Sequence, residues 1–410
     1  MAPAPPSQDD RFPPALIALL AVVFINMMGF GVVVPLLPFF ARAMHAPEWQ
    51  ITGLFSAYSL GQFFAEPFWG RLSDRIGRKR VLLITVFANV IGYTALAFVG
   101  DIWLAIAVRL FTGLGAGNIS TIQGYIADVT SPHLRAGRMG LVGAAFGVGF
   151  IVGPALGGVL AQPAAGRLGY QLPLFVAAGL AAVSAVGVVF FLKESRVHAP
   201  PPQPPWKSLG DARSHPVIGR VLLVSLIYMG GFSGMESTLG LWAQARFDWG
   251  AREIGFCFMA VGIVSAIAQA LVTGRLARRF GESRVLACGV LLFGASLIVQ
   301  TLLPTSLLVP VVMAAGGFGM ALAMPNISAM ISQASPPGRQ GAMLGLNMAA
   351  GSGARIVGPI VAGFTFTYLG PAWPFWTGAL LTVPAAWVAI NAGRALNRWR
   401  AEQSAPALAS

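Results

Sequence analysis

Four charged side chains stand inside long apolar stretches of the sequence: Glu66, Arg109, Glu236 and Arg355. An ionisable group at the centre of a bilayer costs about 2.5–3.5 kcal/mol on insertion scales, so each is a functional candidate by default. Apolar surroundings favour the neutral form of a carboxyl group, which suits a proton carrier that works near neutral pH. We therefore expect these four residues, Glu236 foremost, to couple protons to another process. The alternative is a structural ion pair.

The segments that carry these charges have the length and composition of membrane-spanning helices. Of the 410 residues, 56% are hydrophobic and 10% charged, whereas ordinary globular proteins have about 25% charged residues. A spanning helix needs roughly 20 apolar residues, and the uncharged runs 12–41, 139–166 and 285–338 exceed that length. The sequence predicts an all-α polytopic membrane protein with twelve transmembrane helices, at about 13–41, 49–70, 79–100, 102–127, 137–161, 169–192, 216–245, 252–274, 283–303, 306–333, 338–368 and 372–394.

The cations are distributed unequally between the two ends of these helices. The predicted loops on one side hold 21 of the 27 Lys and Arg residues, those on the other side hold four, and two lie inside helices. Cytoplasmic loops carry the excess of Lys and Arg, so both termini are expected in the cytoplasm. The net charge of +13 then reflects topology, and no nucleic-acid partner is expected.

An internal repeat divides the chain. The basic loop at Gly70–Arg80 has a weaker copy at Gly274–Arg284, 204 residues later, and Gly153-Pro154 recurs as Gly358-Pro359. A Pro-rich stretch between the halves is stiff and extended and cannot form a helix. We expect an N-terminal six-helix bundle at 1–192, a cytoplasmic linker at 193–215 and a C-terminal six-helix bundle at 216–410.

Glycines, one proline and charged residues at fixed spacing carry a resemblance to a known family. The loop pattern Gly-x-x-x-Asp-(Arg/Lys)-x-Gly-Arg-(Arg/Lys) is met by Gly70, Asp74, Arg75, Gly77, Arg78 and Lys79. The pattern Gly-x-x-x-Gly-Pro-x-x-Gly-Gly is met by Gly149, Gly153, Pro154, Gly157 and Gly158. Over about residues 14–394 the chain resembles the major facilitator superfamily, and within it the twelve-helix drug:proton antiporters that include the tetracycline efflux pumps. It departs from those pumps at Asn26 and near Phe293, where they carry acids.

The resemblance implies further roles. Glu236 and Arg355 lie at similar depth on helices that are neighbours in this fold, so an ion pair is expected between them. At the predicted cytoplasmic gate, Asp128 is expected to pair with Arg78, and Asp74 to cap the helix that begins near 338. Pro154 is expected to let its helix bend, with a static packing face for the glycines as the alternative. The expected substrate cavity is lined by Asn26, Phe30, Asn118, Gln123, Tyr228, Phe232, Met235 and Asn326.

These features favour proton-coupled efflux of small lipophilic compounds by alternating access, as in a multidrug or tetracycline-like antiporter. One alternative is a proton-coupled exporter of a specific metabolite such as a sugar or amino-acid derivative. Another is a non-transporting membrane receptor or assembly factor. The sequence has no Gly-x-x-x-x-Gly-Lys-(Ser/Thr) loop and no His/Glu metal motif, so neither enzyme activity nor a cofactor is expected, and the proton gradient is the expected energy source. The expected partners are a small-molecule substrate, protons and the lipid bilayer, for a monomer in the bacterial inner membrane.

Overall fold

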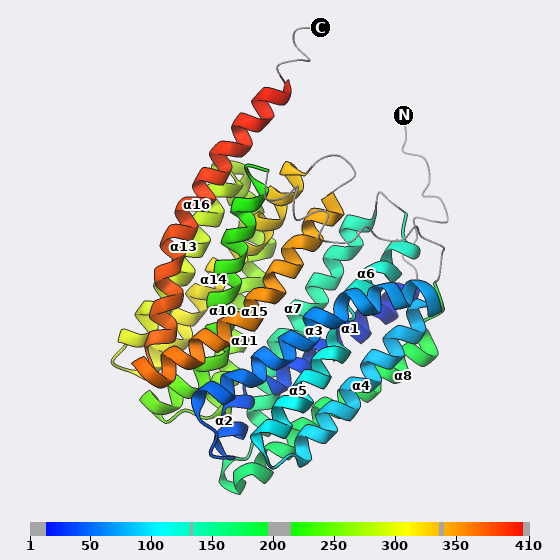
Figure 1. Cartoon of the computed structure of the whole chain (residues 1–410), viewed down its shortest axis with the longest axis vertical. Coiled ribbons are helices and arrows are strands. Elements are labelled where there is room, and N and C mark those ends of the chain that lie inside the picture. The colour runs from blue at the N-terminus through cyan, green and yellow to red at the C-terminus, as the bar shows by residue number, and fades with distance from the viewer. Residues whose placement is uncertain (1–13, 132–133, 196–214, 336–339, 405–410) are drawn as a thin grey trace. The chain divides into compact units, whose positions relative to one another are not determined.

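Figure 1 shows the computed structural model, which describes residues 14–131, 134–195, 215–335 and 340–404. Within these residues every regular element is helical. The elements are α1 (Pro14–Val33), α2 (Leu37–Arg42), α3 (Glu48–Ile76), α4 (Arg78–Phe98), α5 (Ile102–Ala116), α6 (Ile119–Asp128), α7 (Arg135–Leu160), η3 (Pro163–Tyr170), α8 (Gln171–Phe191), α10 (Ile218–Phe247), α11 (Ala251–Ala268), η4 (Gln269–Thr273), α12 (Gly274–Phe280), α13 (Glu282–Leu302), η5 (Ser306–Leu308), α14 (Val309–Ala334), α15 (Gln340–Leu369) and α16 (Trp373–Ser404). Most of the predicted linker at 193–215 lies outside the described residues.

In the described part of the chain, ten helical segments are long and apolar enough to cross a membrane. Two further predicted spans correspond to α3 and α15, which are 29 and 30 residues long. Both carry ionisable side chains, Glu66 in α3 and Arg355 in α15. With these two, the described residues contain the twelve helices of the predicted all-α fold.

Two of the predicted spans, which the structure retains as Pro14–Arg42 and Ile102–Asp128, are each interrupted by a short break in the helix. The segment 13–41 is divided into α1 and α2 around Pro35, which lacks a backbone N–H group. The segment 102–127 is divided into α5 and α6, because Gly117 and Asn118 leave helical geometry at ψ 34° and 6°. A Cβ atom on Gly117 would lie 2.8 Å from the Cβ of Ala65. The break therefore occurs at a close contact with α3.

The chain forms two compact units. The first unit contains the described residues of Met1–Ala46 and Ala57–Pro202 together with Gly250–Met259. The second contains Pro47–Ser56 and the described residues of Gln203–Trp249 and Ala260–Ser410. Each unit thus includes one helix end from the other half of the sequence. In the second unit, for example, the Ser56 hydroxyl donates a hydrogen bond to the Ile356 carbonyl at 2.8 Å.

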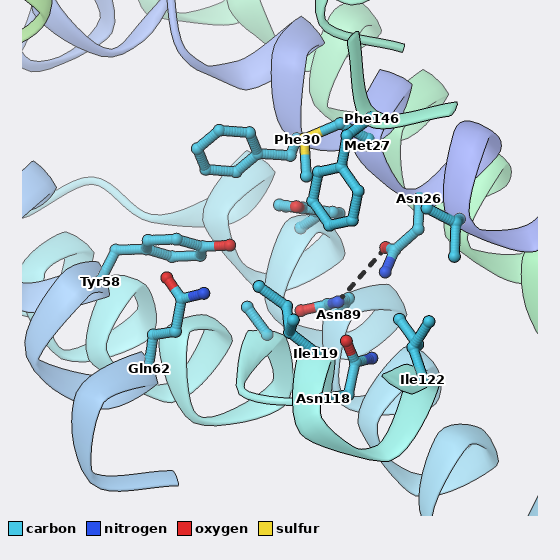
Figure 2. Close-up of a pocket in the computed structure, with 13 residues that line it drawn as sticks. Asn26, Met27, Phe30, Tyr58, Gln62, Asn89, Asn118, Ile119, Ile122 and Phe146 are labelled. Carbon is cyan, nitrogen blue, oxygen red and sulfur yellow. Dashed lines mark hydrogen bonds between the residues drawn. The ribbon is translucent and has the colours of Figure 1, made fainter. Parts of the chain in front are cut away.

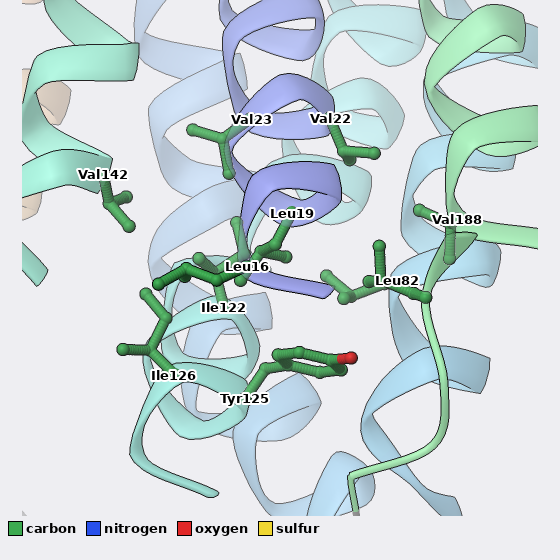
Figure 3. Close-up of a cluster of buried hydrophobic side chains, with 11 residues drawn as sticks. Leu16, Leu19, Val22, Val23, Leu82, Ile122, Tyr125, Ile126, Val142 and Val188 are labelled. Carbon is green, nitrogen blue, oxygen red and sulfur yellow. The ribbon is translucent and has the colours of Figure 1, made fainter. Parts of the chain in front are cut away.

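An apolar cluster occupies one end of the first unit (Figure 3). Its members come from α1, α4, α6, α7 and α8 and are Leu16, Leu19, Val22, Val23, Leu82, Ile122, Tyr125, Ile126, Val142, Val188 and Leu192. The Tyr125 hydroxyl, at the edge of the cluster, donates to the Lys193 carbonyl at 2.9 Å. This bond ties the chain that leaves α8 to α6.

The glycines of α7 form a packing face against α1. A Cβ on Gly153 would lie 2.5 Å from the Met28 carbonyl oxygen, and one on Gly157 would lie 2.2 Å from that of Val32. Real Cβ atoms do not approach a carbonyl oxygen this closely, so only glycine permits the backbones to meet. α7 continues as one helix through Pro154, whose ring faces Gly31. The structure thus contains the packing face, and a bend at Pro154 stays a prediction.

Candidate functional site

A cavity of about 50 Å³ lies within the first unit. It is lined by residues of α1, α3, α4, α5, α6 and α7 together with Asn118, which precedes α6: Val23, Asn26, Met27, Phe30, Tyr58, Gln62, Asn89, Tyr93, Ala116, Asn118, Ile119, Ile122 and Phe146. Figure 2 shows Met27, Phe30 and Phe146 on one side and the amides of Gln62, Asn89 and Asn118 facing them. The cavity is therefore apolar on one side and rich in amides on the other.

Hydrogen bonds orient two of these amides. The Asn89 Nδ2 group donates to Asn26 Oδ1 at 3.5 Å, the bond drawn in Figure 2. Asn118 Nδ2 donates to Thr85 Oγ1 at 3.0 Å. Asn89 is 2% exposed, and its Oδ1 atom has no hydrogen-bond partner among the described residues. One buried acceptor is thus available at the cavity.

Arg109 lies behind this cavity and does not line it. Its guanidinium carbon is 4.3 Å from the centre of the Tyr58 ring, an attractive cation–π arrangement. The side chain is 1% exposed. Tyr58, which lines the cavity, is therefore in contact with a buried positive charge on a residue that is not part of the lining.

The second unit contains the expected ion pair. Arg355 Nη2 of α15 lies 3.7 Å from Glu236 Oε2 of α10. The Glu236 side chain is 3% exposed, whereas that of Arg355 is 28% exposed. Among the described carboxylates only Glu236 is buried. Close packing supports the pair, because the Ser233 hydroxyl of α10 donates to the Ala354 carbonyl at 3.4 Å.

A smaller cavity of about 10 Å³ lies in the second unit. Its lining is mostly apolar and consists of Met235, Val261, Phe293, Ser296, Leu297, Gln300, Met313, Gly316, Gly317 and Met320. The Tyr228 ring packs edge-on against Phe293, with 5.3 Å between the ring centres. Phe293 thus places an aromatic ring, packed on Tyr228, in the wall of this cavity.

The structure assembles only part of the predicted substrate site. Asn26, Phe30 and Asn118 line the first cavity and Met235 lines the second, whereas Tyr228 and Phe232 are buried on α10. Gln123 and Asn326 line neither cavity, and Asn326 Nδ2 donates within its own helix to the Leu322 carbonyl at 2.7 Å. The prediction missed Tyr58, Gln62, Asn89 and Tyr93. Polar side chains inside apolar helices were the signal for Gln62 and Asn89.

Glu66 lies outside both cavities. It is partly exposed on α3, and its backbone carbonyl accepts a hydrogen bond from the Ser120 hydroxyl at 3.0 Å. Gly70, one turn further along α3, faces the same serine. These contacts join α3 to α6, so the observed role of this segment is packing.

The basic loop after α3 is organised around Arg78. Its guanidinium lies 2.7 Å from Asp74 Oδ1 and 3.2 Å from Asp128 Oδ2. Its backbone N–H donates to Glu194 Oε1 at 2.7 Å. Gly124 of α6 leaves room for the guanidinium, since a Cβ there would lie 2.5 Å from the Arg78 Cζ atom. We call Asp74, Arg78, Asp128 and Glu194 the Arg78 cluster.

The Arg78 cluster contains the expected Arg78–Asp128 pair and two partners of Arg78 that the sequence did not indicate, Asp74 and Glu194. The Glu194 carboxylate lies at the N-terminus of α4, where the helix dipole favours an anion. The neighbouring Gly77 has φ of 106°, a conformation that favours glycine. Arg75 is exposed. The expected contact of Asp74 with the helix beyond 338 involves residues outside those described, so it stays a prediction.

Arg78→Gln is expected to destabilise the protein by about 3 kcal/mol, the low end for a broken buried ion pair, because Asp74 is partly solvated. Asp128 would lose its cation while staying 10% exposed. Thermal unfolding of the purified protein in detergent measures the effect. Arg80→Gln, at an exposed neighbouring position, is the control and should leave the melting temperature unchanged. Equal melting temperatures for the two variants would contradict a structural role for the cluster.

Comparisons with known proteins agree on the kind of protein. The family profile described as Major Facilitator Superfamily matches residues 19–282 and 244–405. The tetracycline resistance protein of class C from Escherichia coli is 30% identical over 377 residues, which cover 88% of this chain and 92% of that protein. The class G protein from Vibrio anguillarum is 32% identical over 384 residues, 90% of this chain and 94% of that protein. Multidrug resistance protein 2 of Bacillus subtilis (strain 168) is 27% identical over 358 residues, which cover 85% of this chain and 88% of that protein.

Solved structures give the same fold. The crystal structure of the human organic anion transporter MFSD10 (TETRAN) covers 94% of this chain and 100% of its own, with a TM-score of 0.66 and 24% identity. A bacterial homolog of the human lysosomal transporter Spinster covers 94% and 98%, with a TM-score of 0.79 and 14% identity. At these identities the likeness concerns the arrangement of helices alone.

Proposed function

The chain belongs to the Major Facilitator Superfamily, and from this premise we propose that it exports small lipophilic compounds in exchange for protons. The family places it among transporters and not among enzymes. It is a multi-pass membrane protein with bacterial relatives, several of which are named for resistance to tetracycline or to several drugs. To this family membership the proposal adds the proton as coupling ion, export as the direction of transport, and small lipophilic compounds as the class of substrate.

The buried pair of Glu236 and Arg355 carries the proposal. A carboxylate that is 3% exposed is stabilised by the arginine 3.7 Å away, because burial without a partner would cost several kcal/mol. A proton on Glu236 neutralises the carboxylate and removes most of its attraction to Arg355. Since Arg355 is the more exposed partner, protonation and release of the arginine offer a two-state element that a proton gradient can drive.

The substrate class is supported by the linings of the two cavities. Methionine and aromatic side chains provide adaptable apolar surfaces, which suit several lipophilic ligands. By the resemblance to the tetracycline pumps, this chain lacks their acids at Asn26 and near Phe293. Neither side chain exchanges a proton, so we infer that Glu236 has the proton-carrying role and that the substrate range differs from tetracycline alone.

The location follows from the charge distribution. With 21 of 27 Lys and Arg residues predicted on one side of the membrane, we infer that this side is cytoplasmic and contains both termini. We further infer a monomer in the bacterial inner membrane, with two six-helix halves at 1–192 and 216–410 joined by the linker at 193–215. Substrates would then be taken from the cytoplasm.

A resistance panel tests this function. Expression in a bacterial host that lacks its own efflux pumps should raise resistance to several unrelated lipophilic compounds, and a protonophore should abolish the effect. The same host expressing the Glu236→Gln variant is the matched control for the wild-type protein. Unchanged resistance to the whole panel, together with loss of one cellular metabolite from the cytoplasm, would instead identify a metabolite exporter.

A further inference from the structure

We propose that the cavity of the first unit binds an uncharged hydrogen-bond-donating group of the exported compound, such as a hydroxyl or an amide N–H. The inference rests on the proposed export function and names its substrate class: neutral lipophilic compounds with a polar donor. Three independent observations on the cavity support it.

The first observation is the absence of charge. None of the described residues that line the cavity is an acid, a lysine, an arginine or a histidine. Arg109 packs on the Tyr58 ring and is not among the lining residues. A charged ligand group would lose its hydration here without gaining a counter-ion, at a cost of several kcal/mol. The cavity therefore favours a neutral group.

The second observation is the unused acceptor of Asn89. The Asn89 side chain lines the cavity, and its amide nitrogen donates to Asn26 at 3.5 Å, so the Oδ1 atom is the part of the amide that is left without a partner among the described residues. This atom is buried and has no hydrogen-bond partner in the described part of the chain. A buried acceptor without a donor costs about 1–3 kcal/mol. A ligand that supplies an N–H or O–H group recovers that free energy, whereas a ligand with acceptors alone does not.

The third observation comes from the internal repeat. The offset of 204 residues relates Asn89 to Phe293, Tyr93 to Leu297 and Ala116 to Met320. All six residues line a cavity, the first of each pair in the first unit and the second in the second unit. The two cavities are thus equivalent positions of one repeated fold. Since Phe293 occupies its position at 2% exposure, the fold itself does not require an amide there.

The size and lining of the cavity complete the description. A volume of about 50 Å³ accommodates a few waters at about 10–15 Å³ each, or one polar group that replaces them. Phe30 and Tyr58 pack with 5.2 Å between their ring centres, and Met27 and Phe146 lie on the same side as Phe30 (Figure 2). These side chains provide an apolar contact for the body of a compound whose donor reaches Asn89.

Two probes and two substitutions test the site. Chloramphenicol is neutral and aromatic with hydroxyl and amide N–H donors, and tetraphenylphosphonium is a lipophilic cation without donors. Equilibrium binding to the purified full chain in lipid nanodiscs, without a proton gradient, measures both. Asn89→Leu should weaken chloramphenicol binding about tenfold and leave tetraphenylphosphonium binding unchanged. Asn89→Asp should raise tetraphenylphosphonium affinity relative to chloramphenicol by at least about tenfold.

Gln171→Leu is the matched control, because it also removes an amide from the first unit but lies outside the cavity, where Gln171 donates to the Ala97 carbonyl. It should leave the binding of both probes unchanged. Wild-type protein that does not bind chloramphenicol would overturn the proposal, as would an Asn89→Leu variant that binds it normally or loses both probes equally. Proton-driven transport is measured separately in proteoliposomes. If transport is absent while Asn89-dependent binding is intact, the export function is refuted and the proposed binding site is not.

Discussion

Glu236→Gln is expected to reduce substrate-driven proton release from proteoliposomes to the level of protein-free vesicles. The substitution preserves the size of the side chain but removes the one buried carboxylate among the described residues. A glutamine cannot take up or release a proton, so the cycle loses its coupling ion. Exchange of labelled substrate across the membrane without a gradient should continue, because the cavities do not contain Glu236.

Glu253→Gln is the control for this result. Glu253 accepts a hydrogen bond from the Gly250 N–H at 2.9 Å near the start of α11, outside the ion pair. The Glu253→Gln variant should show wild-type substrate-driven proton release. Wild-type proton release by Glu236→Gln would remove Glu236 from the mechanism, and the pair with Arg355 would then be structural.

Gly157→Val is expected to eliminate most of the folded protein. A Cβ atom at this position would lie 2.2 Å from the Val32 carbonyl oxygen, and that oxygen belongs to the backbone of α1. Overpacking costs about 1–3 kcal/mol when side chains can adjust, and more when a whole helix must move. Size-exclusion chromatography of detergent extracts measures the loss as a fall in the monodisperse peak.

Gly147→Val provides a control on the same helix. A Cβ at Gly147 would meet no atom within 4 Å, so this variant should be produced and should elute like the wild type. Equal behaviour of the two variants would mean that α7 does not pack against α1 through its glycines.

The positions of the helices could be predicted because apolar length and charged loops are local signals in the sequence. The pairing of Glu236 with Arg355 could also be predicted, since two opposite charges in apolar helices rarely stay apart. The breaks at Pro35 and Gly117 were less visible. The break at Pro35 follows from the proline itself, which was overlooked as a signal. The break at Gly117 lies at a contact with α3, and a single sequence contains no record of that contact.

The cavity was predicted poorly because the expected lining was restricted by resemblance to α1, the α5–α6 segment, α10 and α14. Tyr58 and Gln62 come from α3, and Asn89 comes from α4. Glu194 could not be predicted, since it lies outside the apolar segments and accepts a hydrogen bond from the backbone N–H of Arg78, a group that every residue except proline carries. Local patterns identify helices, whereas a site depends on contacts between distant residues.

The contact of the Pro154 ring with Gly31 has a mechanical consequence. A Cβ on Gly31 would lie 2.9 Å from Pro154 Cδ, so no side chain cushions the two helices at this point. The predicted bend of α7 at Pro154 would therefore displace the α1 backbone directly. Because Asn26, Met27 and Phe30 of α1 line the cavity, a displacement of α1 would change the shape of the cavity and hence its contacts with the proposed substrate.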